Sequence, residues 1–351
     1  MDNSRKITHT MIETALTKAL RDIEENSNRG IRNLVDLGTH LAKGRFQKEF
    51  FRISQQMLDN ENSAYYAMTN NIVRNVNHQI IKNFGVNLGY NSWTYGAEKI
   101  RECQKTYGHN IPWTIIFDFR QDMPTMLSSK EISGVLSCGE SLGIYCGMFL
   151  VNREKAYLKT LLAVLATHKE SAYFLFVPPE IITEEIAREI VNAGNIIIVL
   201  EMNTAGESPG CRNAAAILLN RKCLYGIYSM YGDDNVEYVM SDCYLRQIEE
   251  FYCTFAFLIR EDLKDAQNKE RFSQFMETAK SANEYIFFLI DFYEDLANVD
   301  KIISGEDCFL AIKTNGGIAV TLTETLSAEL NIRTNSLQTI LKETMFKTQS
   351  I

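Results

Sequence analysis

The sequence predicts an α/β protein in which a parallel sheet is curled into part of a barrel. Six short apolar runs rich in β-forming residues begin at spacings of 23 to 30 residues, near positions 114, 144, 172, 195, 224 and 251. Helical patterns lie between them, at 128–142, 155–168, 182–193, 212–222 and 240–250. Near-continuous apolar strands that alternate with helices indicate a parallel sheet whose faces are covered by helices.

The number of these units favours a barrel over a dinucleotide-binding sheet. No Gly-x-Gly-x-x-Gly pattern follows the first strand, as a nucleotide-binding turn would require. A helical pattern at 265–283 leads to a seventh apolar run at 285–292. We therefore predict a partial (β/α)6-type TIM-like barrel over residues 111–295.

Residues 1–110 are predicted to form an all-helical segment that precedes the barrel. Apolar residues recur there at helical spacing, in 7–26, 30–42, 46–60 and 63–83. The aromatic residues Tyr90, Trp93 and Tyr95 follow, in a Gly-rich passage that leads into a short helix. They could stack on a planar ligand, but packing against the barrel is the favoured interpretation.

The C-terminal residues 296–351 are predicted to form a β-hairpin and a helix packed on the barrel. Two short apolar runs within 308–322 are joined through Thr314-Asn315-Gly316-Gly317, a sequence typical of a hairpin turn. A helical pattern then spans 335–346.

Composition indicates a soluble globular protein. The 351 residues are 46% hydrophobic and 23% charged, and no apolar run is long enough to cross a bilayer. The N-terminus lacks a hydrophobic signal core. The eight cysteines stand singly, without a CxxC pair, so free thiols and a cytoplasmic location are expected.

The charge distribution narrows the class of partner. Residues 1–110 hold 15 basic and 11 acidic residues (+4), whereas 111–351 hold 21 and 33 (−12), which together give the net charge of −8. An acidic main domain argues against nucleic acid as a partner, and no membrane partner is expected. The expected partner is a small molecule, a peptide or another protein, and a homo- or hetero-oligomer is possible.

Several passages, in this order, resemble the radical S-adenosylmethionine (radical SAM) enzymes, in particular a bacterial subgroup with a helical N-terminal extension. They are NFGVN, NIPWTIIFDF, SSKEISGVLSCGESLGIYCGMFL, AYFLFVPPEIITEEIAREIVNAGNIIIVLEMN, IDFYEDLANVDKIISGEDCFLAIKTNGGIAVTL and NIRTNSLQTIL. The resemblance covers most of the chain and supports the predicted barrel.

The resemblance implies a four-iron, four-sulfur cluster that this sequence does not provide for. The family holds the cluster with three cysteines of a CxxxCxxC loop directly after the first strand, and its open iron chelates the amino acid end of SAM. Here the loop after Phe119 reads RQDMPTML. The nearest cysteines, Cys103 and Cys138, lie before the strand and on the following helix.

Two further family features are also missing. The Gly-Gly-Glu-Pro turn, whose backbone approaches the SAM amino group, is replaced by VNREKAY at 151–157, and only Glu154 remains in register. Pro178-Pro179 stands where the family has a Thr-Asn-Gly-like turn, and Cys308 is the single cysteine of the C-terminal region. We therefore predict no bound cofactor, neither the cluster nor SAM, and no metal site.

Parallel barrels bind ligands at the carboxyl ends of their strands, and polar residues are predicted at those ends. The pocket candidates are Asp118, Arg120, Asn152, Arg153, Glu154, Glu201, Asn203, Arg212 and Asp291. The resemblance places Glu201 where the family has a polar residue facing the SAM pocket, and Arg212 near a family arginine. Catalytic residues are not identified. The alternative interpretation is that these groups are strand-end caps and ion pairs.

These observations predict a catalytically degenerate radical SAM-like protein without an iron–sulfur cluster. It would act as a binding, regulatory or scaffold protein for a small molecule, a peptide or a partner enzyme. One alternative is an active radical SAM enzyme with non-standard cluster ligands. Another is a barrel enzyme of a different class, with Asp118 and Glu201 as acid and base.

Overall fold

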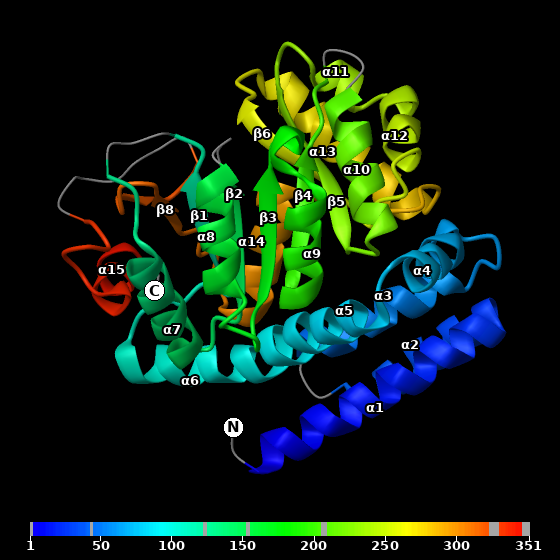
Figure 1. Ribbon diagram of the computed structural model, residues 1–351, viewed down its shortest axis with the longest axis horizontal. Coiled ribbons are helices and arrows are strands. Elements are labelled where there is room, and N and C mark those ends of the chain that lie inside the picture. Colours follow the sequence, from blue (N-terminus) through cyan, green and yellow to red (C-terminus); the bar gives the residue numbers. More distant parts are fainter. Residues whose placement is uncertain are drawn as a thin grey trace.

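The computed structural model describes residues 3–42, 45–121, 125–151, 155–204, 209–322 and 330–345 (Figure 1). Its centre is a nine-stranded sheet in the order β7-β6-β5-β4-β3-β2-β1-β8-β9. All neighbours pair in parallel except β8 and β9. The strands are β1 (Thr114–Phe119), β2 (Cys146–Val151), β3 (Ala172–Val177), β4 (Ile196–Glu201), β5 (Tyr225–Gly232), β6 (Phe255–Asp262), β7 (Phe288–Asp291), β8 (Ala311–Lys313) and β9 (Ile318–Ala319).

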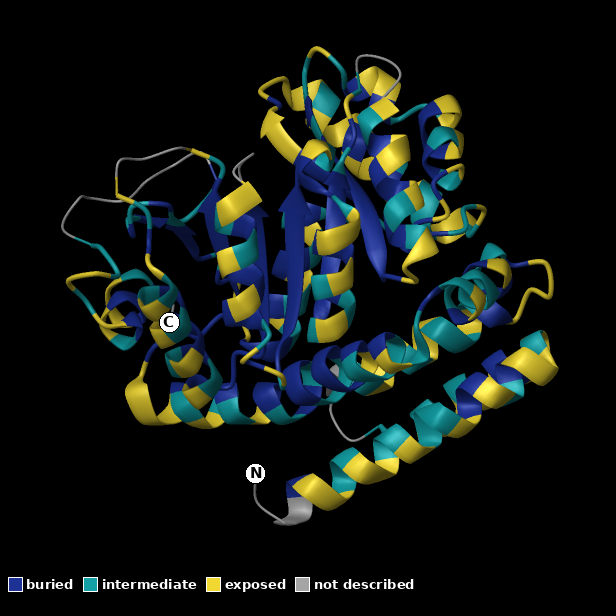
Figure 2. Cartoon of the chain, viewed as in Figure 1, coloured by how far each residue is buried: buried dark blue, intermediate teal, exposed yellow. Residues whose placement is uncertain are grey.

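The strands form where the sequence is apolar on both faces. Every residue of β1, β2 and β3 is buried, as expected for a parallel sheet covered on both sides. In contrast, the last three residues of β6 are exposed, although Arg260 and Asp262 still pair with β5 (Figure 2). The prediction of a partial TIM-like barrel is confirmed.

Helices that connect the strands cover the convex face of the sheet. Figure 2 shows their outer sides exposed and the strands behind them buried. The first begins with a capping box, in which the Ser128 and Glu131 side chains each bind the other residue's backbone N–H. The helices are α7 (Ser129–Leu142), α8 (Lys155–Leu165), α9 (Glu184–Ala193), α10 (Pro209–Asn220), α11 (Val236–Val239), α12 (Asp242–Glu249) and α13 (Ala266–Ala282), and a short 3₁₀ turn, η2 (Pro179–Ile181), follows β3.

The concave face is filled by α14 (Phe292–Ile303), which follows β7. The ring of Phe292 packs edge-on against Phe176 at 5.6 Å, and Phe176 packs in the same way against Phe257 at 5.1 Å. In its second turn, α14 accepts a hydrogen bond from the Trp113 indole N–H at the Leu296 carbonyl, 3.3 Å away. The interior of the half-barrel is therefore an apolar core, and polar groups that could bind a ligand are confined to its rim.

The N-terminal helices run beneath the amino ends of the strands (Figure 1). They are α1 (Asn3–Glu25), α2 (Ser27–Leu41), α3 (Arg45–Leu58), α4 (Ala64–Asn75), α5 (His78–Phe84), the π-helix η1 (Gly85–Gly96) and α6 (Ala97–Tyr107). The prediction of one helix over 63–83 is wrong. The helix ends at Val76, and the Asn77 side chain caps a new one by accepting the backbone N–H of Gln79.

The predicted aromatic packing below the sheet is confirmed. The rings of Trp93, in η1, and Trp113 pack with their centres 6.2 Å apart. The guanidinium of Arg5 lies over the ring of Tyr95, 4.0 Å from the ring centre. Arg5 is buried and also pairs with Glu170 at 2.9 Å. These contacts attach α1 to the base of the barrel.

The C-terminal hairpin and helix are also found. β8 pairs in parallel with β1, so the hairpin extends the sheet beyond its first strand. α15 (Leu337–Thr344) packs against α7. No helix in the described part of the chain is long and apolar enough to span a bilayer.

Candidate ligand-binding site at the carboxyl edge of the sheet

A cavity of about 1090 Å³ opens at the carboxyl ends of β4, β5 and β6. Its volume is slightly above the roughly 300–1,000 Å³ that small-molecule sites occupy. Glu201, Met202 and Asn203 line it from β4, Met230 and Tyr231 from β5, and Glu261 and Asp262 from β6. The cavity therefore lies where parallel barrels place their ligands.

The described lining of this cavity is strongly acidic. Lys264 is its one basic residue, and six carboxylates face it: Glu180, Glu201, Asp233, Asp234, Glu261 and Asp262. Six negative charges against one positive charge leave a formal charge of −5 on this lining. A lining of one sign in a concave site concentrates ligands of the opposite charge, so the cavity favours a cation.

Hydrogen bonds hold the loops around the cavity in place. The Asn235 side chain donates to Thr204 Oγ1 at 2.8 Å and to the Met230 carbonyl at 3.2 Å, which joins the loops after β4 and β5. Asp233 accepts from the Asn268 side chain and from the backbone N–H of Lys264, and these bonds lower its pKa. These hydrogen bonds hold the Asp233 carboxylate in position at the cavity.

Cys211 lines the same cavity but does not fit the role of a nucleophile. Its side chain is fully buried, and burial raises the pKa of the thiol to about 12. The thiolate is the nucleophilic form, and at neutral pH this cysteine stays protonated.

An ion cluster lies at the carboxyl end of β1, next to the cavity. Asp118, 4% exposed, accepts hydrogen bonds from Arg120 Nε at 2.8 Å and Nη2 at 3.1 Å. It also accepts from Lys313 Nζ, on β8, at 2.8 Å. We call these three residues the β1 ion cluster.

The cluster has two cations and one carboxylate. Burial alone would raise the pKa of Asp118, but the hydrogen bonds and charges of Arg120 and Lys313 outweigh it, and the pKa is lowered. The Asp118 carboxylate is therefore charged at neutral pH, and the formal charge of the three residues together is +1. Arg120 Nη1 lies 3.5 Å from Glu261 Oε1, which connects the cluster to the cavity wall.

The structure separates the predicted pocket residues into groups. Glu201 and Asn203 line the cavity, and Asp118 and Arg120 belong to the β1 ion cluster. Arg212 pairs with Glu250 at 2.9 Å on the surface, away from the described lining. Asp291 caps α14 by accepting the backbone N–H groups of Tyr293 and Glu294. Asn152, Arg153 and Glu154 lie outside the described residues.

Most charged members of the site were not predicted from the sequence. Lys313 reaches Asp118 because β8 pairs with β1, 195 positions earlier in the chain. Asp233 and Glu261 lie beyond the apolar runs of β5 and β6, in segments of ordinary polar composition. The sequence could have indicated these residues only by their position after predicted strands, because the loops that follow barrel strands hold binding and catalytic residues.

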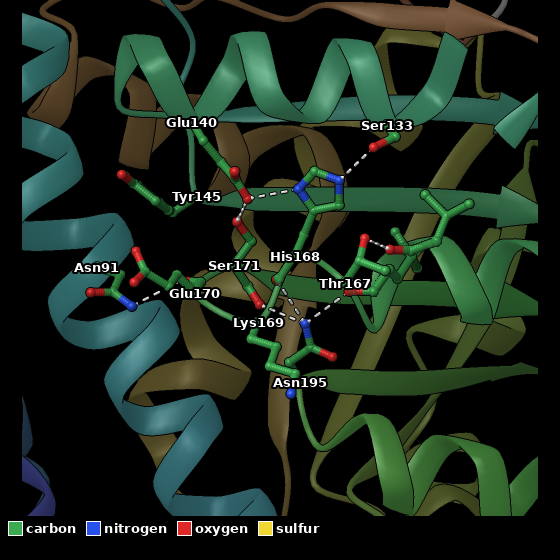
Figure 3. Close-up of polar contacts among 12 residues, drawn as sticks. Asn91, Ser133, Glu140, Tyr145, Thr167, His168, Lys169, Glu170, Ser171 and Asn195 are labelled. Atoms are coloured by element: carbon green, nitrogen blue, oxygen red, sulfur yellow. Dashed lines mark hydrogen bonds and ion pairs between the residues drawn. The ribbon is translucent and has the colours of Figure 1, made fainter. Parts of the chain in front are cut away.

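A second polar cluster lies at the opposite end of the strands (Figure 3). Glu140 of α7 accepts from His168 Nδ1 at 3.1 Å and from Ser171 Oγ at 2.8 Å. The carboxylate can only accept, so Nδ1 carries the proton, and in the neutral ring Nε2 accepts from Ser133 Oγ at 3.0 Å. Asn195 donates to three backbone carbonyls beside it, those of Leu165, His168 and Ser171.

This serine, histidine and glutamate have the hydrogen-bond order of a hydrolase triad but not its surroundings. Ser133 lies in the second turn of α7, where backbone N–H groups donate within the helix and cannot stabilise an oxyanion. The cavity that Ser171 lines is only about 10 Å³. We interpret the cluster as a link between α7 and the β2–β3 connection.

The donor atoms do not fit an iron–sulfur cluster. All eight cysteines are described and free, and none lies in the loop between β1 and α7. Cys103 on α6 and Cys138 on α7 are partly buried, and burial raises the pKa of both thiols. Among the described residues, no three His, Cys, Asp or Glu side chains are grouped so that they could hold a metal ion.

Comparison with known proteins adds to this geometry. No protein-family model and no curated protein matches the sequence. SuiB of Streptococcus suis bound to S-adenosylmethionine matches with a TM-score of 0.52 and 11% identity, over 70% of this chain and 69% of SuiB. SuiB alone matches with a TM-score of 0.51 and 12% identity, over 70% of this chain and 69% of SuiB. SuiB bound to its precursor peptide SuiA matches with a TM-score of 0.52 and 12% identity, over 70% of this chain and 68% of SuiB.

SuiB is a radical SAM enzyme. This chain has the radical SAM fold. The resemblance inferred from the sequence is confirmed at the level of the fold, because identities of 11 to 12% extend no further than that.

The prediction that the chain binds no cofactor is wrong. SuiB, which shares the fold of this chain, is found bound to S-adenosylmethionine, and this finding overturns the prediction. The sequence-based prediction inferred the loss of SAM from three missing family features: the cluster cysteines, the Gly-Gly-Glu-Pro turn and the Thr-Asn-Gly-like turn. The cavity at β4–β6 does not depend on those cysteines, and its size and acidic lining fit a ligand with a sulfonium and an ammonium group.

Proposed function

We propose that this protein binds SAM in the cavity at the ends of β4, β5 and β6 and acts as a SAM-responsive binding or regulatory protein. The acidic lining of that cavity is the observation that carries the proposal. SAM has two cationic groups and one carboxylate, so it is a net cation near neutral pH. Glu201, Glu261 and the other cavity carboxylates would hold its ammonium and sulfonium groups.

The same proposal excludes reductive cleavage of SAM. The resemblance implies three cysteine ligands in the loop after β1. In this chain the loop begins with Arg120, which pairs with Asp118, and Asp118 also pairs with Lys313. Guanidinium and ammonium groups do not ligate iron, and one carboxylate does not replace three thiolates. The chain's own residues would bind and orient SAM, and the sulfonium would remain intact.

A peptide is the second candidate ligand. One SuiB structure holds its precursor peptide, which supports a peptide partner for a chain with the same fold. The acidic cavity would favour a basic segment. Competition between such a peptide and SAM would place both in the same cavity.

The test is isothermal titration calorimetry with SAM. The wild-type protein should bind one SAM per chain, and Glu201→Gln should weaken binding by about tenfold, as expected for the loss of one charged contact. Glu250→Gln is the matched control, because Glu250 pairs with Arg212 outside the cavity lining, and its affinity should be that of the wild type. Absence of SAM binding by the folded wild-type protein at millimolar ligand would overturn the proposal.

A further inference from the structure

The β1 ion cluster has one more positive charge than its carboxylate can neutralise. Asp118 and Lys313 are 4% and 17% exposed, and Arg120 is 26% exposed. Both cations bind the same carboxylate, and Lys313 also donates to the Leu322 carbonyl at 2.6 Å. A partly buried cation in excess favours the approach of an anion.

The geometry directs that excess charge toward the cavity. Asp118 takes the Nε and Nη2 hydrogens of Arg120, so the Nη1 edge of the guanidinium remains on the side of Glu261. The contact between Arg120 Nη1 and Glu261 Oε1 is long, at 3.5 Å, and the Glu261 side chain is 57% exposed. Exposed pairs of this kind contribute little to stability, so another carboxylate can replace Glu261 there at small cost.

In radical SAM enzymes the open iron of the cluster chelates the amino acid end of SAM, and this chain lacks the cysteines that would hold that iron. The ligand's carboxylate therefore needs another cationic partner. The lining of the neighbouring cavity is acidic, with Lys264 already paired to Asp262 at 2.8 Å. Arg120 is not part of the described cavity lining, but its Nη1 lies 3.5 Å from Glu261, which is, and it carries positive charge that Asp118 alone does not neutralise.

We propose that Arg120 binds the α-carboxylate of the ligand in place of the cluster iron and thereby selects ligands with a complete α-amino acid group. This inference rests on the proposed function. Asp118 and Lys313 act as positioning residues, since they hold the guanidinium and maintain its surplus charge. Glu261 occupies the carboxylate position when no ligand is bound, and the cavity carboxylates bind the ammonium and sulfonium groups.

Decarboxylated SAM provides a direct test, because it keeps the adenosine, sulfonium and ammonium groups and lacks only the carboxylate. Its affinity and that of SAM are measured by calorimetry for each variant. The wild-type protein should prefer SAM by about 10- to 100-fold, the ratio that corresponds to a hydrogen bond to a charged group. Arg120→Gln should lose this preference and bind decarboxylated SAM at least as tightly as SAM, because the acidic lining repels the SAM carboxylate. Arg120→Lys should keep part of the preference for SAM.

Glu261→Gln should change the preference in the opposite direction. Removal of the competing carboxylate should strengthen SAM binding relative to decarboxylated SAM, whereas any loss of attraction for the two cationic groups affects both ligands alike. Glu261 is exposed, so this variant tests the idea even where Arg120→Gln does not fold. Arg212→Gln is the matched control, and its preference should equal that of the wild type.

The outcomes distinguish this inference from the proposed function. Equal wild-type affinity for SAM and decarboxylated SAM, or a folded Arg120→Gln that keeps the preference, would overturn the role of Arg120 and leave SAM binding standing. Failure of the wild-type protein to bind either ligand would overturn both.

Discussion

Replacement of Asp118 by Asn should destabilise the protein by about 3 kcal/mol, the lower end of the cost of breaking a buried ion pair. The carboxylate is 4% exposed and accepts three short hydrogen bonds from Arg120 and Lys313. Asn keeps the shape but removes the charge, so two cations, 26% and 17% exposed, lose their counter-ion. Their partial access to water is the reason for choosing the lower end of the range.

The assay is urea unfolding at pH 7, followed by circular dichroism, with Asp262→Asn as the matched control. Asp262 pairs with Lys264 at 2.8 Å, but both side chains are more than two-thirds exposed, and loss of this pair should cost less than about 1 kcal/mol. A difference of under about 0.5 kcal/mol between Asp118→Asn and the wild type, on the same scale, would refute the view that the β1 ion cluster fastens β8 to β1.

The pH dependence of this difference has a defined sign. The pKa of Asp118 is lower in the folded protein than the ordinary value of about 3.9 expected in the unfolded chain. Its contribution is therefore fully present above about pH 4 and is lost as the pH falls through the lower, folded pKa. The stability difference between wild type and Asp118→Asn should be constant from pH 5 to 8 and should shrink only in more acidic solution.

Three other substitutions test the rest of the structure. Asp300 is 3% exposed, and burial raises the pKa of its carboxyl group to about 8. The folded protein therefore holds a proton that the unfolded chain releases, and stability falls as the pH rises from about 4 to 8. Asp300→Asn should reduce the difference in stability between pH 5 and pH 7.5, measured by urea unfolding. Arg5 lies between the rings of Tyr95 and Tyr145 and pairs with Glu170, so Arg5→Ala should destabilise the protein by about 2–4 kcal/mol and make α1 sensitive to limited proteolysis. Arg21 is exposed, and Arg21→Ala should change neither the stability nor the proteolysis of α1. Glu140→Ala should cost about 2 kcal/mol in thermal unfolding by leaving His168 and Ser171 without their acceptor, and an unchanged melting temperature would contradict the linking role of that cluster.

The fold could be predicted from the sequence because the sheet depends on local patterns. Apolar runs such as those of β1 and β4 are buried on both faces, and their 23- to 30-residue spacing leaves room for one helix between strands. The hairpin could be predicted because its turn is likewise a local pattern, an Asn-Gly-Gly sequence between two short apolar runs. A single helix over 63–83 was predicted wrongly because Val76 continues the apolar stripe across the break. The break is marked only by Asn77, whose side chain caps the following helix α5 through a single contact.

The site was harder to predict because it depends on contacts between distant segments. Glu201 and Asn203 were found from their position after a strand, but the partnership of Lys313 with Asp118 follows from the β8–β1 pairing, which has no local pattern. Arg212 was selected by resemblance, and an exposed pair with Glu250 holds it on the surface. The prediction of no cofactor rested on family features missing after β1, β2 and β3, whereas the cavity lies at the ends of β4, β5 and β6.

The central claim is that SAM binds at the carboxyl edge of this barrel without an iron–sulfur cluster and is not cleaved. The most direct measurement is anaerobic reconstitution with iron and sulfide, followed by iron counting and by chromatography of SAM after reduction with dithionite. We expect iron far below the four atoms per chain of a complete cluster, SAM recovered intact and retained by the protein, and no 5′-deoxyadenosine. Near-stoichiometric iron with reductive formation of 5′-deoxyadenosine would contradict the account.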